Sequence, residues 1–272
     1  MFKSRKDGGT DCLHIYVGFF GGVVDDMMRS DRLMPTARRS HSRWPSFIWI
    51  FALFASLTVG FSVVHAKEYG SYDLRRVLTA SEKPDGKKFG IDTNYLDRIL
   101  EDLALHARNY PPRFDTPEDR QRAIADAKAL SEMLGVVVNG PSAHPDLLLR
   151  AGFLNSMGHN LDIPGSAEKT LSIFQRLLAA APDHPRGNYT YGTFLAGVGK
   201  SKDAIPYLKK ALGAGVVDAA YALGMTYLTL GDKQKALENL ANYKQQRPND
   251  QNVDRLIEGI RSGTIEIKRV HK

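Results

Sequence analysis

The sequence feature that most constrains the fold is a self-similar pattern that occurs three times between residues 145 and 250. Each copy joins a first segment with a central glycine to a second amphipathic segment, and the glycines are Gly152, Gly192 and Gly224. The copies span 145–184, 185–216 and 217–250. A helix pair of this length cannot bury its apolar face alone, so successive copies must stack on one another. The pattern predicts an all-α protein of stacked antiparallel helix hairpins.

The third copy carries the residues that permit a comparison with a known family. Leu223-Gly224 followed by Tyr227 resembles the L-G-x-x-Y core of the tetratricopeptide repeat (TPR). Three further positions match that family's alanine, large apolar and proline positions, namely Ala236, Leu240 and Pro248. The family's tryptophan is absent, because Leu148, Asn188 and Ala220 occupy its place. The resemblance implies a TPR-like solenoid, a right-handed superhelix whose concave groove, over 142–250, binds a peptide or protein partner.

Helical segments flank the three repeats. Residues 92–141 form a predicted helical hairpin that either caps the stack or is a divergent repeat, with Asp92 and Pro117 near its helix starts. The apolar face expected for its first helix is Tyr95, Leu96, Ile99, Leu103 and Leu105. Residues 251–272 are expected to form a capping helix and a tail. The helix has an apolar stripe of Val253, Leu256, Ile257 and Ile260.

Two short segments have less regular patterns. Residues 67–91 are polar and interrupted by glycine and proline, so we expect a linker or a short irregular segment, with a polar turn at 86–90. Within it, residues 72–78 fit either a short strand or a short helix. The tail from Thr264 to Val270 alternates apolar and polar residues, which fits either an edge strand or a frayed terminus.

The first 66 residues are expected to lie outside the fold. Residues 46–64 contain no charged side chain and follow Arg38, Arg39 and Arg43, which is the order of a secretory signal peptide over 34–66. Cleavage is expected between Ala66 and Lys67. The same apolar run is near the length that spans a bilayer, so a single N-terminal membrane anchor is the alternative. The expected location is the bacterial periplasm or, for the anchor, the inner membrane.

Residues 1–33 fit neither a signal nor an anchor, because they carry five acidic residues. We interpret them as a disordered extension from a misassigned start, with Met34 as the true start and Cys12 outside the protein. The chain has a net charge of +7, and removing residues 1–66 takes away eight basic and five acidic residues and leaves +4. That is ordinary surface charge and gives no support for nucleic-acid binding. One cysteine also excludes an intrachain disulfide.

Catalytic motifs and metal-ligand spacings are missing from the sequence, so we expect no enzyme, no cofactor and no metal. His144 and His184 each precede a proline at a repeat boundary and are interpreted as turn residues. The rival hypothesis is an enzyme or enzyme accessory domain with a site in 67–141. It requires His106, Asp97 and Tyr110 to converge in a deep pocket.

The remaining candidate site is the groove lined by the first helices of the repeats. Helical phase points six side chains toward it, namely Arg186, Tyr189, Thr193, Tyr221, Met225 and Leu228. Tyrosine and arginine are enriched at binding hot spots, and methionine adapts to varied partners. The sequence therefore predicts a non-catalytic interaction module or scaffold of the cell envelope, contacting the membrane only through 46–64 if uncleaved. A membrane-anchored assembly factor is the alternative, and oligomer formation is left open.

Overall fold

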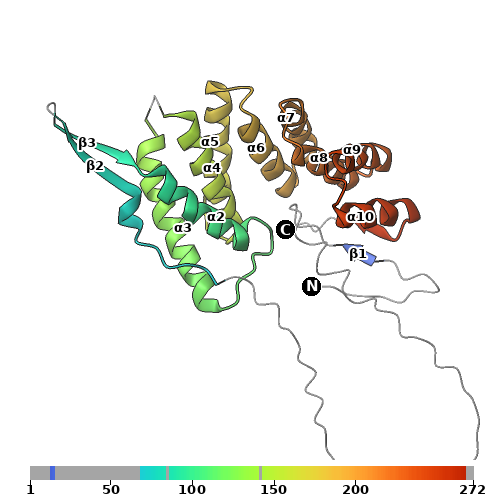
Figure 1. Cartoon of the computed structure of the whole chain (residues 1–272), viewed down its shortest axis with the longest axis horizontal. Helices are drawn as coiled ribbons and strands as arrows, with labels where there is room; N and C mark the ends of the chain where they lie inside the picture. The colour runs from blue at the N-terminus through green and yellow to red at the C-terminus, as the bar shows by residue number, and fades with distance from the viewer. Residues whose placement is uncertain (1–12, 16–67, 84–85, 141–142, 268–272) are drawn as a thin grey trace, which may run out of the picture.

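The computed structural model describes residues 13–15, 68–83, 86–140 and 143–267 (Figure 1). This part of the chain is an all-α solenoid, as the sequence predicts. Its helices follow one another along an arc, with the even-numbered members toward the inner side (Figure 1). The helices are α2 (Thr93–Ala107), α3 (Pro117–Val138), α4 (Pro145–Asn160), α5 (Ser166–Ala180), α6 (Pro185–Gly197), α7 (Ser201–Gly213), α8 (Asp218–Thr229), α9 (Lys233–Gln246) and α10 (Gln251–Ser262).

The three repeat hairpins, α4–α5, α6–α7 and α8–α9, are each closed around a glycine in the first helix. A Cβ atom placed on Gly192 would lie 2.8 Å from the Leu208 side chain, and one on Gly224 would lie 2.7 Å from Leu240. Gly152 has the same relationship to Phe174. The absence of a side chain therefore sets how closely the two helices of each hairpin approach.

Three helices begin at a side chain that acts as N-cap. His144 and His184 are the N-caps of α4 and α6, and each accepts a hydrogen bond from a backbone N–H of the first turn through Nδ1. Asp92 caps α2 in the same way. Both histidines are therefore turn residues, as the sequence predicts, because an imidazole nitrogen replaces the hydroxyl or carboxylate oxygen of a common N-cap.

The first helix pair, α2 and α3, is joined by the segment that precedes it in the chain. The Tyr69 hydroxyl donates to Asp126 of α3, whereas the Tyr72 hydroxyl donates at 2.7 Å to Asp102 of α2. Tyr69 is fully buried and also contacts the rings of His106 and Phe114. Residues 68–72 thus tie the two helices together with aromatic packing and two tyrosine–carboxylate bonds.

The predicted turn at 86–90 is wrong, because these residues belong to a strand. A short 3₁₀ helix (Leu74–Val77) leads into strand β2 (Leu78–Lys83), which pairs antiparallel with β3 (Gly86–Ile91) from Leu78↔Ile91 to Lys83↔Gly86. Figure 1 shows this hairpin projecting beyond α2 and α3. The sequence pattern of these two strands does not indicate a hairpin, because glycine, lysine and alanine are poor strand formers. Backbone pairing rather than side-chain propensity therefore defines the hairpin.

Helix α10 closes the other end of the solenoid, and its apolar stripe is buried as predicted. The tail continues as strand β4 (Ile265–Ile267), with Ile265 lying directly over Gly259. Strand β4 pairs in parallel with β1 (Leu13–Ile15), so the tail is a strand.

Cys12, Met34, the apolar run 46–64 and the cleavage position Ala66–Lys67 lie outside the described residues. Among the residues that are described, no helix is both long enough and apolar enough to cross a membrane. One predicted core residue is also misplaced, because Leu105 is 64% exposed. It follows Leu103 by two positions, which puts it on the opposite side of a helix with 3.6 residues per turn.

Candidate partner-binding face

Equivalent residues of successive first helices form rows across the solenoid. Relative to the glycine of each repeat, Tyr189 and Tyr221 stand at the same position of α6 and α8, and Arg186 and Asp218 stand one turn earlier. Leu149 of α4 continues the tyrosine row. Because α6 packs against both α4 and α8, these rows lie side by side.

The structure divides the six groove residues expected from helical phase into two groups. Arg186 is exposed, and Tyr189 and Tyr221 are half-buried. Thr193, Met225 and Leu228 are only 2%, 6% and 6% exposed. Helical phase predicted that these three side chains face the groove, but the structure buries them. Neighbouring first helices pack along their flanks, so these side chains belong to the core of the solenoid.

Tyr189 and Tyr221 retain free hydroxyl groups. Within the described part of the chain, neither hydroxyl has a hydrogen-bond partner, although both rings are largely removed from water. A tyrosine hydroxyl in such surroundings usually has a partner. The two side chains therefore present hydroxyl donors that no protein group uses within the described residues.

Tyr243 of α9 completes this surface, although helical phase assigned only residues of first helices to the groove. Its ring meets that of Tyr221 edge to face at 5.4 Å, and its hydroxyl donates at 3.1 Å to Asp250, the N-cap of α10. No spacing in the sequence marks this contact, because Tyr243 lies in α9 and Asp250 follows the loop after that helix. We call Tyr189, Tyr221, Tyr243, Asp218 and Asp250 the tyrosine face.

Burial and nearby carboxylates stabilise the neutral form of all three tyrosines. Burial raises the pKa of Tyr189 to about 12, with Asp218 adding to the effect and Arg108 opposing it. Burial and the Asp250 carboxylate raise the pKa of Tyr221 to about 12 as well. The pKa of Tyr243 also rises to about 12, because of burial and its hydrogen bond to Asp250. All three hydroxyls therefore remain donors at any physiological pH.

Charged groups of both signs border the tyrosine face. Asp218 is exposed and forms no ion pair among the described residues, and Arg186 is likewise exposed and unpaired within them. On the α4 side, the Arg108 guanidinium lies 5.7 Å from the centre of the Phe153 ring. The surface therefore offers aromatic rings, hydroxyl donors and separated positive and negative groups.

The residues required by the enzyme hypothesis do not come together. His106 is buried, stacks on Phe114 at 4.9 Å, and its Nδ1 donates at 3.1 Å to the Arg113 carbonyl. Asp97 instead forms a two-bond ion pair with Arg150 of α4, at 2.7 and 2.6 Å. Tyr110 is 40% exposed. In the described ranges, no group of three or more histidine, cysteine or acidic side chains is placed to hold a metal.

The arrangement of hairpins thus defines an all-α repeat solenoid. Neither a protein-family model nor a curated protein sequence matches the chain. Among solved structures, it is similar to a thermophilic TPR protein of Thermus thermophilus, with a TM-score of 0.44 and 18% identity over 62% of this chain and 92% of that one. It is also similar to YrrB, described as a TPR protein with an unusual peptide-binding site, with a TM-score of 0.36 and 19% identity over 61% and 85% of the two chains.

Proposed function

We propose that this protein is a non-catalytic interaction module that binds an extended segment of a partner protein across the tyrosine face. The observation that carries the proposal is the pair of unpartnered hydroxyls on Tyr189 and Tyr221. Two donors fixed on adjacent parallel helices suit the carbonyl groups of a peptide backbone. The rings beside them supply rigid apolar contact area.

The charges around the face indicate the chemistry of the segment. The free Asp218 carboxylate lies near Tyr189, where it favours a basic side chain that also packs on the aromatic rings. Arg186 occupies the equivalent position one repeat earlier and favours an acidic group. A segment with a basic and an acidic residue about one repeat apart would satisfy both.

Site-specific photocrosslinking in the full chain tests this function. A photoreactive aromatic residue at Tyr221 is expected to capture a defined protein, whereas the same residue at Lys209, exposed on the outer helix α7, is not. A Tyr189→Ala/Tyr221→Ala variant with the probe at Tyr243 should lose the product. A Tyr189→Phe/Tyr221→Phe variant should keep part of it, because the rings remain. Equal capture from Tyr221 and Lys209 would contradict the proposal.

We further propose that the module acts in the bacterial cell envelope. The support is the sequence order of Arg38, Arg39 and Arg43, the uncharged run 46–64 and the small residues before Lys67. Cell fractionation and N-terminal sequencing test it. Release with the periplasm and a new terminus at Lys67 fit a cleaved signal, and retention with the inner membrane fits an anchored assembly factor. Recovery with the cytoplasm would contradict both.

A further inference from the structure

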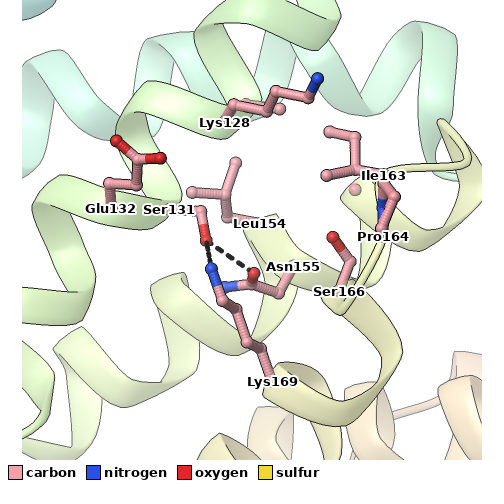
Figure 2. A pocket seen from close by; sticks show the side chains of 11 residues that line it. Lys128, Ser131, Glu132, Leu154, Asn155, Ile163, Pro164, Ser166 and Lys169 are labelled. Atoms are coloured by element: carbon pink, nitrogen blue, oxygen red, sulfur yellow. Dashed lines mark hydrogen bonds between the residues drawn. The ribbon is translucent and has the colours of Figure 1, made fainter.

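A pocket of about 200 Å³ lies between α3, α4 and the start of α5, away from the tyrosine face (Figure 2). Its floor is buried and its rim is exposed. The floor is formed by Ala127, Leu154, Asn155, Gly158 and Ser166, and the rim by Lys128, Glu132, Pro164 and Lys169. Pockets for drug-sized ligands are usually about 300–1,000 Å³. This one therefore suits a compact ligand that enters from solvent.

A hydrogen-bond chain orders one wall of the pocket. The Lys169 ammonium donates at 3.2 Å to the Ser131 hydroxyl, which donates at 2.8 Å to the Asn155 side-chain oxygen (Figure 2). The Asn155 amide nitrogen in turn donates at 2.8 Å to the Ala151 carbonyl. The chain positions Lys169 across from α3 and leaves its ammonium with further N–H donors for a ligand.

Ser166 is the feature that points to a ligand. Its side chain lines the pocket and is only 4% exposed, yet within the described residues its hydroxyl has no hydrogen-bond partner. Figure 2 shows the hydroxyl directed toward the open space rather than toward Lys169. Because the hydroxyl opens into the pocket and no protein group uses it, a ligand oxygen there would find a hydrogen-bond donor already in place.

The charges of the pocket indicate the sign of that ligand. Lys128 forms no ion pair among the residues described, and neither does Lys169, so the pocket rim carries two ammonium groups and one carboxylate, that of Glu132. Ser166 is also the first residue of α5, whose N-cap, Gly165, has no side chain to cap the helix. The positive end of the helix dipole therefore adds to the two lysines.

We propose that this pocket binds a small molecule through a carboxylate or phosphate group, with Lys128, Lys169 and Ser166 as donors. One oxygen of the ligand group accepts from the Ser166 hydroxyl, and the two flexible lysines of the rim supply the opposing positive charge. Because no residue is shared with the tyrosine face, this site is independent of the proposed partner binding.

Calorimetric titration of the full chain with sodium phosphate and, separately, sodium succinate tests the site, with sodium chloride holding the ionic strength constant. We expect saturable binding of one anion per chain by at least one of the two salts, and which salt binds distinguishes phosphate from carboxylate. Lys128→Gln and Ser166→Ala should each weaken that binding about tenfold, the usual effect of losing a hydrogen bond to a charged group. Lys209→Gln, an exposed lysine on α7, is the matched control and should bind as the original chain does.

Circular dichroism of each variant separates loss of binding from loss of fold. Lys128 is exposed, so its replacement disturbs no packing and remains a clean test if Ser166→Ala unfolds. The proposal is overturned if neither anion gives saturable heat. It is also overturned if Lys128→Gln binds as tightly as the original chain, or if Lys209→Gln weakens binding equally.

Discussion

The Tyr69 hydroxyl donates a 3.0 Å hydrogen bond to Asp126 Oδ2, and this contact fastens the segment before the first helix pair to α3. The Arg122 guanidinium reinforces it by donating at 2.9 Å to the Tyr69 carbonyl. On the other side, Gly70 and Tyr72 donate to the single carboxylate of Asp102. The solenoid therefore begins at residue 69, before its first helix.

Replacing Tyr69 by phenylalanine is expected to lower the free energy of unfolding by about 1 kcal/mol, because the buried ring stays and only its hydrogen bond to Asp126 is lost. Urea denaturation measures the change. Tyr207→Phe is the matched control, since the Tyr207 hydroxyl has no hydrogen-bond partner among the described residues. Equal losses in the free energy of unfolding of the two variants would contradict a stabilising role for the Tyr69–Asp126 hydrogen bond.

The same substitution should change the titration of Asp126. Burial raises the pKa of this carboxyl, whereas the Tyr69 hydrogen bond and Arg122 lower it. A raised pKa means that the contribution of Asp126 to stability is full at acidic pH and is lost as pH rises through the folded-state pKa. Tyr69→Phe removes one of the lowering effects, so the pKa of Asp126 should rise further. Carbon-detected NMR titration of the carboxyl measures it, and a fall in the pKa would contradict the assignment.

Replacing His184 by alanine is expected to destabilise the protein by about 1 kcal/mol, the usual effect of losing an N-cap. The His184 Nδ1 atom accepts the Gly187 backbone N–H at 3.1 Å, and alanine leaves that donor without a partner. His184→Asn should retain most of the stability, because asparagine is a good N-cap. Thermal unfolding compares the two variants, and a His184→Asn protein no more stable than His184→Ala would count against the capping role.

The repeat hairpins could be predicted from the sequence because their determinants are local. Gly192 and Gly224 each precede the leucine that they contact, Leu208 or Leu240, by the same number of residues in the sequence. His184 stands directly before a proline that begins a helix. Each of these residues acts within one hairpin. A single sequence therefore contains enough information to place the helices and their caps.

The parts that escaped prediction depend on contacts between distant segments. The strand pairing of 78–83 with 86–91 comes from backbone hydrogen bonds in residues with weak strand preference. Tyr69 is buried because α2 and the segment after it supply His106 and Phe114, which lie far along the chain. Neither feature leaves a periodic pattern in the sequence.

The candidate face was only partly predictable for a related reason. Helical phase pointed Tyr189 and Tyr221 toward a side of each first helix that the structure leaves half-buried, but it could not show how far neighbouring helices cover that side. Met225 and Leu228 share the same phase and are buried by this packing. Tyr243 was missed because it reaches the face from a second helix.

The tyrosine face should produce a late phase in an alkaline titration. The pKa values of Tyr189 and Tyr221 are raised from 10.0 to about 12, so the unfolded chain loses these protons first. Their contribution to stability is therefore full below pH 10 and is lost as pH rises toward 12. Phenolate absorbance, recorded after a rapid pH jump and before the chain unfolds, measures the late deprotonation of these tyrosines. Tyr189→Phe and Tyr221→Phe should each reduce its amplitude equally, and a single common step in the original chain would contradict the burial of both rings.

Replacing Gly192 by alanine is expected to destabilise the protein by about 1–3 kcal/mol, because the new methyl group would lie 2.8 Å from Leu208 and 3.2 Å from its backbone nitrogen. The backbone cannot yield without separating α6 from α7. Gly213→Ala is the matched control, since a Cβ at this position in the last turn of α7 meets no atom within 4 Å. That change should instead stabilise the protein slightly, because alanine has the higher helix propensity. Urea denaturation distinguishes the two, and a Gly192→Ala chain as stable as the original would show that Gly192 does not set the spacing of the hairpin.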